Sequence, residues 1–296
     1  MKIAFIGLGN MGAPMAANLV KAGFDVCGFD LGAAAMDNAR ALGVAGAGSS
    51  VEAARDADCV ITMLPAGKHV LSVYAQDGGV LASASKGALF VDCSTIDVGD
   101  ARKAHAIANA AGHQSLDAPV SGGVAGAQAG SLTFMAGGEA TAFSKASSVL
   151  AAMGARSVHC GPAGAGQAAK ICNNMILGVS MAAVCEGIVL AEKLGLSHKA
   201  LFDVVSTSSG SCWSITKNCP MPGLVEASAS NNDFKPGFAA ELMLKDLTLA
   251  AAAARNSGAR CELGEHARTL YEDYCKQGNG GMDFSAIVQA LRNAAQ

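Results

Sequence analysis

The sequence has little charge, few aromatic side chains and no basic cluster. Charged residues make up 15% of the 296 residues, aromatic residues make up 5%, and the net charge is -3. Proteins that bind nucleic acid or a membrane surface usually carry a patch of Lys and Arg, and this sequence has none. Its uncharged apolar run Met175–Cys185 is too short to span a bilayer. We therefore expect neither nucleic acid nor a membrane as a partner.

Paired cysteines and grouped metal ligands are absent as well. The ten cysteines form no C-x-x-C pair, and no His/Cys grouping has the spacing of a zinc site. The six histidines are scattered, and the sequence shows neither a Ser-His-Asp arrangement nor an H-x-x-x-H pair. These absences argue against a metal centre, a disulfide framework and serine-type hydrolysis. Scattered thiols and an N-terminus without a signal-peptide pattern predict a cytoplasmic protein.

What is present begins with a strand, a glycine-rich turn and a helix. Lys2–Ile6 is a short apolar, β-branched run that predicts a buried strand. Gly7, Gly9 and Gly12 follow in G-x-G-x-x-G spacing, and apolar residues then repeat at helical period. In such a turn the first glycine permits the tight bend, the second lets the backbone approach a pyrophosphate, and the third allows close helix–strand packing. The expected cofactor loop is Gly7, Leu8, Gly9, Asn10, Met11 and Gly12.

An acidic residue follows this turn at the expected place. A second predicted strand, Val26–Phe29, ends at Asp30, and no arginine follows until Arg40. A carboxylate there can accept hydrogen bonds from the ribose hydroxyls and would repel a 2′-phosphate. The strand, turn, helix and carboxylate together predict a dinucleotide site that takes NAD rather than NADP. A glycine turn that binds nothing is the plainer alternative.

The alternation of strands and helices continues through the first half. Further strands are predicted over Cys59–Pro65 and Ala88–Thr95, with helical segments near 50–56, 68–76 and 98–111. This alternation is typical of a Rossmann-type, doubly wound parallel sheet. Ligands bind at the carboxyl ends of such strands, so Leu64, Pro65 and Thr95 are candidates to line the cofactor. Two other interpretations stay open: Leu64 and Pro65 simply end a strand, and Thr95 caps the following helix.

A glycine-rich turn follows the next predicted strand, which ends at 117–119. Ser121, Gly122 and Gly123 offer a hydroxyl and successive backbone N–H groups without side-chain obstruction. Such a concavity suits a carboxylate. The alternative is an ordinary glycine turn before the strand predicted over Leu132–Gly138.

The second half has helical periodicity and no strand alternation. One long helix is predicted over Gly164–Leu194, and shorter helices over 198–206, 238–255, 262–276 and 284–294. We therefore expect an NAD-binding Rossmann domain at 1–162 and an all-helical substrate and oligomerisation domain at 163–296. The long helix is so apolar that we expect a second subunit to cover part of it, in a homodimer or homotetramer.

One lysine stands out in that long helix. Lys170 is the only formally charged side chain between Arg156 and Glu186, and an unpaired ammonium is costly to bury. On a helix Lys170 and Asn174 share a face. Beside an NAD domain, the amine can take a hydroxyl proton while hydride passes to the nicotinamide, and Asn174 can hold the same oxygen. The alternative is a lysine whose head group reaches solvent.

Four segments in this order are recognisable as those of a known family. They are FIGLGNMGAPMAANLVKAG, DAPVSGGVAGAQAGSLTFMAGG, GAGQAAKICNNMI and FAAELMLKDLTLA. Together they resemble the β-hydroxyacid dehydrogenases, and within them the hydroxyisobutyrate branch, over essentially the whole chain. The resemblance implies NAD-dependent oxidation of a small 3-hydroxy carboxylate to its 3-oxo acid.

The resemblance also implies roles for individual residues. Lys170 would be the catalytic lysine, and Asn174 would orient the substrate. The other implied contacts are Ser121, Gly122 and Gly123 with the substrate carboxylate, Thr95 and Lys245 with the nicotinamide half of NAD, Leu64 and Pro65 near its ribose, and Asp246 and Trp213 on the substrate side. Without the resemblance, the adjacent Lys245 and Asp246 would be typical of a solvated pair. Asn218-Cys219 stand where this branch has Tyr-Asn before a proline.

The expected reaction is oxidation of 3-hydroxyisobutyrate to methylmalonate semialdehyde, a step of valine catabolism. Within the same family, L-serine and tartronate semialdehyde are the alternative substrates. Two alternatives come from other classes: an imine reductase, which typically lacks this lysine, and a non-catalytic NAD-sensing protein.

Overall fold

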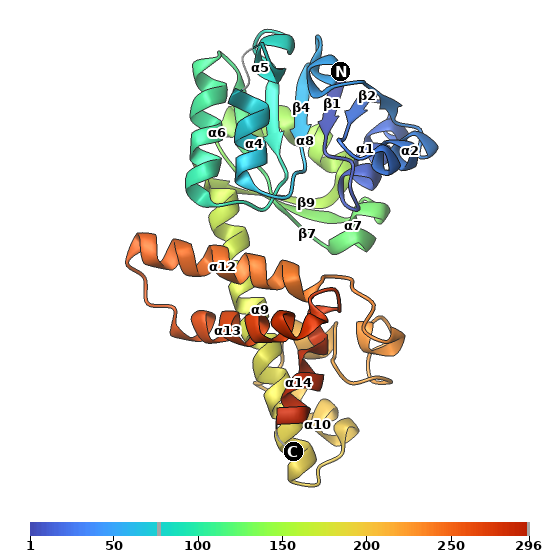
Figure 1. The fold of residues 1–296 in the computed structure, drawn as a ribbon, viewed down its shortest axis with the longest axis vertical. Helices are drawn as coiled ribbons and strands as arrows, with labels where there is room; N and C mark the ends of the chain where they lie inside the picture. Colours follow the sequence, from blue (N-terminus) through green and yellow to red (C-terminus); the bar gives the residue numbers. More distant parts are fainter. Residues whose placement is uncertain (76–77, 295–296) are drawn as a thin grey trace. The chain divides into compact units, whose positions relative to one another are not determined.

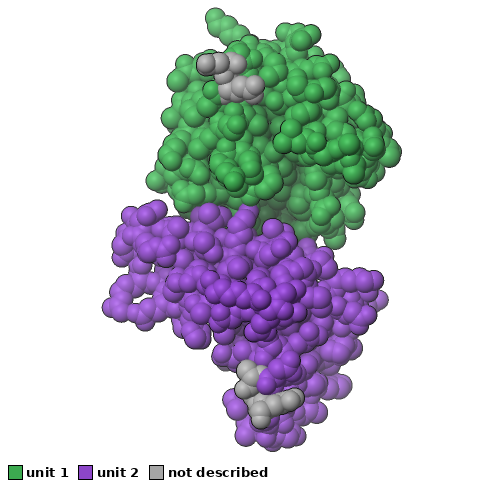
Figure 2. Space-filling view, in the orientation of Figure 1, with its two compact units in different colours: residues 1–170 green, residues 171–296 purple. Residues whose placement is uncertain are grey.

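A computed structural model describes residues 1–75 and 78–294 of the chain. The chain divides into two compact units, Met1–Lys170 and Ile171–Gln296, which Figure 2 shows in different colours. This division falls inside one helix, α9 (Ala165–Lys193), which begins in the first unit and continues through the second. The domain boundary expected at 162/163 stays a prediction.

The first unit is built around one sheet (Figure 1). Its strands are β1 (Lys2–Ile6), β2 (Asp25–Phe29), β3 (Ala45–Gly46), β4 (Cys59–Thr62), β5 (Leu89–Asp92), β6 (Gln114–Asp117), β7 (Val120–Ser121), β8 (Leu132–Gly137) and β9 (Gly154–Gly161). The spatial order is β3-β2-β1-β4-β5-β6-β8-β7, and β9 pairs with β8. All pairs from β3 through β6 are parallel, which confirms the Rossmann-type fold.

The strand order reverses direction between β1 and β4. The chain adds β2 and β3 on one side of β1 and then crosses over to build β4, β5 and β6 on the other. In doubly wound sheets this reversal opens a crevice at the carboxyl ends of the two central strands, where ligands bind. The residues that leave β1 and β4 are Gly7 and Met63, at the start of the two loops predicted to meet the cofactor.

The edge beyond β6 departs from a purely parallel sheet. β8 runs antiparallel to both β6 and β7, and β9 then pairs parallel to β8. The strand predicted over Leu132–Gly138 is therefore present as β8, but its direction and its partner β9 were not expected.

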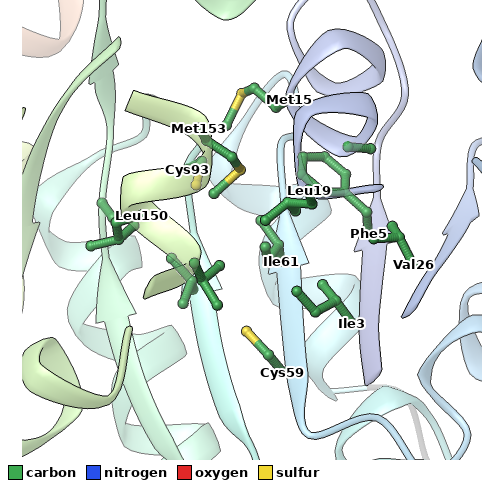
Figure 3. Packing of buried hydrophobic residues seen from close by; sticks show 14 of the residues in the cluster. Ile3, Phe5, Met15, Leu19, Val26, Cys59, Ile61, Cys93, Leu150 and Met153 are labelled. Carbon is green, nitrogen blue, oxygen red and sulfur yellow. The ribbon is translucent and has the colours of Figure 1, made fainter. Parts of the chain in front are cut away.

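Helices cover both faces of this sheet. They are α1 (Gly12–Lys21), α2 (Ala33–Ala41), α3 (Ser50–Ala54), α4 (Gly67–Ala75), α5 (Val80–Ser83), α6 (Val98–Ala110), α7 (Gly123–Ala129) and α8 (Ala140–Met153). Alternate strand residues enter two separate cores: Ile3 and Phe5 enter one, and Ala4 and Ile6 the other. Figure 3 shows Met15 and Leu19 of α1 and Leu150 and Met153 of α8 in the first core. Successive residues of a strand point to opposite faces of the sheet. Both faces of this sheet are therefore buried.

The second unit is helical, as predicted (Figure 1). Besides the continuation of α9 it contains α10 (His198–Val205), α11 (Trp213–Thr216), α12 (Ala240–Ser257), α13 (Glu262–Tyr274) and α14 (Ile287–Ala294), with short turns η1 (Ala229–Asn232), η2 (Cys275–Asn279) and η3 (Phe284–Ala286). Met181, Cys185 and Ile188 of α9 join Met243 and Leu247 of α12 in its core.

By length and composition alone, α9 could cross a membrane, with a mean hydropathy of 1.8 over an 18-residue window. Met181, Cys185 and Ile188 are buried against other helices of the second unit, and Lys170 and Asn174 are buried polar residues of the same helix. These contacts are those of a core helix.

Candidate active site

The glycine turn after β1 is shaped by contacts that leave no room for side chains. Gly7 has a φ of +95°, and a Cβ there would lie 2.2 Å from the carbonyl oxygen of Met63. A Cβ on Gly12 would lie 1.9 Å from the carbonyl oxygen of Gly7. A Cβ on Gly9, in contrast, would meet no heavy atom within 4 Å. The turn is therefore packed tightly at both ends and open in the middle, where the backbone can approach a phosphate.

The N-terminus of α1 is available for the same purpose. Met11 is the N-cap residue and makes no side-chain capping hydrogen bond, and Asn10 beside it is exposed. Helix N-termini bind phosphates through their first N–H groups and the positive end of the helix dipole. No capping side chain competes with a phosphate at this end.

Asp30 ties the glycine turn to the end of β2. Its Oδ2 accepts the N–H of Leu8 at 2.7 Å, and its Oδ1 accepts the N–H of Gly32 at 2.8 Å. Each carboxylate oxygen has two acceptor sites, so both keep capacity for ribose hydroxyls. Leu8 is buried beneath the turn, so the carboxylate also fixes the loop that it follows.

The loops after β4 and β5 are joined by buried hydrogen bonds. The N–H of Leu64 donates to Ser94 Oγ at 2.8 Å, and the Ser94 hydroxyl donates to Asp92 Oδ1 at 2.6 Å. Thr62 Oγ1 donates to the same oxygen at 2.7 Å. Pro65 is exposed and Thr95 is half-buried. The N-cap of α6 is Asp97, so the alternative that Thr95 caps that helix is wrong.

The turn after β7 requires glycine at two positions. Gly122 has a φ of +134° and Gly123 a φ of +61°, in the region that side chains avoid. The turn leads into the short helix α7, and β8 begins only at Leu132, so Ser121–Gly123 is not a simple turn into that strand. Successive N–H groups in this conformation, beside the Ser121 hydroxyl, can accept an anion.

Asp117 holds the first turn of α9. Its Oδ1 accepts the N–H of Gly164 at 2.7 Å, and its Oδ2 accepts the N–H of Gln167 at 2.8 Å. His105 Nε2 donates to Oδ1 at 3.0 Å, and the Ser115 hydroxyl donates to His105 Nδ1 at 2.7 Å. The sequence predicted no Ser-His-Asp arrangement, and this prediction is wrong, because the three residues come from α6 and β6 and meet only in the fold.

This Ser115–His105–Asp117 chain is not the nucleophilic site of a hydrolase. All three side chains are buried, and both oxygens of the Asp117 carboxylate accept backbone N–H groups at the start of α9. A serine nucleophile has to be within reach of a substrate. Burial of Ser115 therefore argues against a serine nucleophile at this place.

Lys170 is 7% exposed, so most of this residue is removed from solvent. It lies one helical turn before Asn174 on α9. Asn174 is oriented at both ends of its amide, since Nδ2 donates to Asp246 Oδ2 at 2.5 Å and Oδ1 accepts Asn173 Nδ2 at 2.9 Å. The position of Asn174 is therefore held by α12 as well as by its own helix.

Lys245 and Asp246 differ sharply in environment. Asp246 is buried, whereas Lys245 is partly exposed, and Lys245 Nζ lies 3.7 Å from Asp246 Oδ1. A solvated pair is therefore the wrong description of Asp246. Its Oδ1 accepts no hydrogen bond within the described part of the chain, and its Oδ2 orients Asn174.

The two residues that depart from the hydroxyisobutyrate branch lie inside the helical unit. Asn218 Nδ2 donates to Asp283 Oδ1 at 3.1 Å, and Asn218 Oδ1 accepts the N–H of Ala229 at 3.1 Å. Cys219 belongs to the hydrophobic core. Trp213, by contrast, is 53% exposed at the start of α11. Asn218 and Cys219 are thus buried residues of the helical unit, whereas Trp213 is on its surface.

Comparison with known proteins agrees with this arrangement. Residues 2–161 match the family model of the NAD binding domain of 6-phosphogluconate dehydrogenase. Residues 164–291 match the model described as NAD-binding of NADP-dependent 3-hydroxyisobutyrate dehydrogenase. A probable 3-hydroxyisobutyrate dehydrogenase of Mycobacterium tuberculosis is 52% identical over 293 residues, which cover 99% of this chain and 98% of that protein.

The chain belongs to the 3-hydroxyisobutyrate dehydrogenase family. It is an NAD-dependent 3-hydroxy acid dehydrogenase.

Three further comparisons concern the substrate named for relatives and the fold. An NAD-dependent L-serine dehydrogenase of Pseudomonas aeruginosa is 47% identical over 295 residues, covering 100% of this chain and 99% of that protein. A solved structure of Mycobacterium tuberculosis 3-hydroxyisobutyrate dehydrogenase with L-serine has a TM-score of 0.94 and 53% identity, covering 98% of each chain. An imine reductase from Myxococcus stipitatus, at 15% identity, covers 98% of this chain and 99% of its own, and its TM-score of 0.66 shows a shared fold alone.

Asp92 makes the stability of this family member depend on pH. Burial raises the pKa of its carboxyl to about 6, although hydrogen bonds from Ser94 and Thr62 lower it. A folded-state pKa above the ordinary 3.8 means that the folded protein favours the protonated form. The contribution of protonated Asp92 to the free energy of unfolding is therefore fully present below about pH 4 and is lost as the pH rises through about 6.

We predict that Asp92→Asn removes this dependence. The free energy of unfolding of the variant, relative to the parent, should rise by up to about 3 kcal/mol between pH 4 and pH 7. Urea unfolding at several pH values measures it, with Asp25→Asn, which removes an exposed carboxylate, as the control. A difference that stays flat across this pH range would contradict the assignment.

Proposed function

We propose that the protein oxidises 3-hydroxyisobutyrate to methylmalonate semialdehyde with NAD, as a step of valine catabolism in the cytoplasm. The observation that carries the proposal is a buried lysine, Lys170, one helical turn from an asparagine whose amide is fixed by Asp246. The names of two relatives, 52% and 46% identical to this chain, support the substrate, and ten unpaired cysteines agree with a reducing compartment.

In this reaction the neutral amine of Lys170 takes the proton of the C3 hydroxyl. NAD, when bound, accepts the hydride that leaves C3, and the products are the aldehyde, NADH and the lysine ammonium. Asn174 holds the reacting oxygen through its amide, whose orientation Asp246 fixes. A proton acceptor in this step is an amine in its uncharged form.

The remaining proposed contacts divide between substrate and cofactor. Ser121, Gly122 and Gly123 bind the substrate carboxylate through a hydroxyl and N–H groups, and Asp246 and Trp213 border the substrate. NAD is held by Gly7, Leu8, Gly9, Asn10, Met11, Gly12, Asp30, Leu64, Pro65, Thr95 and Lys245. The open middle of the glycine turn and the spare acceptor sites of Asp30 support these assignments.

L-serine is the second candidate substrate. It is also a 3-hydroxy carboxylate, with an ammonium in place of the C2 methyl group. The 47%-identical relative from Pseudomonas aeruginosa is an L-serine dehydrogenase, and the Mycobacterium tuberculosis enzyme was solved with L-serine. An ammonium needs an acceptor, and the Oδ1 of Asp246 is one on the proposed substrate side.

A substrate panel tests the proposal. Initial rates with 3-hydroxyisobutyrate, L-serine, tartronate semialdehyde and a cyclic imine are compared, each with the matching oxidised or reduced NAD and NADP. We expect the highest kcat/KM for 3-hydroxyisobutyrate with NAD, about 10-fold or more above L-serine, since exchanging one small group changes selectivity by about 10- to 200-fold. L-serine or tartronate semialdehyde ahead by that margin overturns the named substrate, and absence of turnover throughout favours the NAD-sensing alternative.

We also propose a homodimer or homotetramer, because α9 exposes large apolar side chains. Ile176 is 61% and Leu190 60% exposed on this helix. Sedimentation equilibrium at micromolar concentration should give the mass of two or four chains, and Leu190→Glu should shift the distribution toward one chain. A parent protein that sediments as a single chain contradicts the assembly.

A further inference from the structure

Gln167 is a completely buried amide in the first turn of α9, and it uses both ends of its side chain on one loop. Its exposed fraction is 0%. Its Oε1 accepts the N–H of Ile96 at 3.0 Å, and its Nε2 donates to the carbonyl oxygen of Ser94 at 2.7 Å. The two bonds fall on the residues immediately before and after Thr95. Gln167 therefore fixes the backbone of Thr95 from both sides.

The helix turn that carries Gln167 is itself immobilised on the sheet. The N–H groups of Gly164 and Gln167 donate to the Asp117 carboxylate. A Cβ on Gly166 would lie 2.2 Å from the carbonyl oxygen of Met135, and one on Gly137 would lie 2.6 Å from the N–H nitrogen of Gly166. Helix and strand backbones are thus in direct contact, and this turn cannot slide along the strand ends.

The loop that carries Thr95 is anchored on its other side by β5. Ser94 donates its N–H and its hydroxyl to Asp92 Oδ1 at 3.2 Å and 2.6 Å, and its Oγ accepts the N–H of Leu64. Asp92 fixes the strand side of the loop and Gln167 fixes the helix side. Removal of the Gln167 amide would leave the N–H of Ile96 and the carbonyl of Ser94 without these partners in a buried setting, and the loop would rearrange to satisfy them.

We propose that Gln167 is a positioning residue that holds Thr95 at a fixed position relative to Lys170. Lys170 follows Gln167 by three residues on the same helix, so one rigid turn connects the proposed base to the loop proposed at the nicotinamide half of NAD. This inference rests on the proposed roles of Thr95 and Lys170. Its consequence is specific: loss of the amide displaces the nicotinamide half, whereas the glycine turn and Asp30 continue to hold the rest of the cofactor.

Gln167→Met tests the inference, because methionine keeps the length of the side chain and removes both hydrogen bonds. We expect kcat to fall about 10- to 100-fold, the size of effect that follows a small misplacement of reacting groups. The dissociation constant of NADH, measured by fluorescence, should stay nearly unchanged. Gln289→Met, at an exposed glutamine of α14, is the matched control and should leave both quantities unchanged.

Gln167→Glu adds a readout that a merely structural role would not move. A protonated glutamate can donate to the Ser94 carbonyl as the amide does, whereas an ionised one cannot. The ratio of the variant's kcat to the parent's should therefore rise as the pH falls. Parent-like kcat in Gln167→Met, or a loss of NADH affinity in proportion to kcat, overturns the proposal, as does a pH-independent ratio for Gln167→Glu.

Hydrogen exchange separates this inference from the proposed function. In Gln167→Met the Ile96 amide should exchange about 10-fold faster or more than in the parent, with or without turnover of any substrate. If the substrate panel names another 3-hydroxy acid, the kinetic comparison is made with that acid. Unchanged exchange of the Ile96 amide overturns the proposed positioning role of Gln167 by itself. Full activity of Lys170→Ala beside a defective Gln167→Met overturns only the proposed role of Lys170 as the base.

Discussion

The carboxylate of Asp117, at the end of β6, accepts the first free N–H groups of α9 and so fixes where that helix starts on the sheet. A helix start exposes unpaired donors and a positive dipole end, and a buried carboxylate satisfies both. Everything proposed for catalysis on α9 follows from this anchor, because Gln167 and Lys170 lie within the next two turns. His105 and Ser115 hold the carboxylate in turn, which explains a buried Ser-His-Asp chain in a dehydrogenase.

The glycine turn expected to hold the cofactor depends on backbone packing rather than on charge. Gly7 and Gly12 let β1 and α1 approach until no side chain fits, and Asp30 ties the resulting turn to β2. The turn lies at the reversal of strand order, where doubly wound sheets bind their ligands. The proposed cofactor half of the site is thus a property of the fold, whereas the proposed substrate half depends on particular side chains such as Asn174 and Asp246.

Elements with an apolar pattern of their own could be predicted from the sequence. Contacts between residues far apart in the chain could not. The strands β1, β2, β4 and β5 and the helices α9, α10, α12 and α13 follow apolar patterns and lie close to where the sequence predicted them, whereas β3 and α11 were not predicted. β9 was missed because it is largely exposed and has no such period. Ser115, His105 and Asp117 meet only through the crossover of α6. Gln167 could have been found: the cost of burying a polar group, which singled out Lys170, applies equally to an amide three residues earlier.

The most direct test of the central claim, that the buried lysine is the base, is chemical rescue of Lys170→Ala. The variant should lose about 10²- to 10⁴-fold in kcat, the usual size of a general acid–base contribution. Added methylamine or ethylamine should restore part of the rate, in proportion to the concentration of the uncharged amine. A variant with near-parent kcat in the absence of amine would contradict the account.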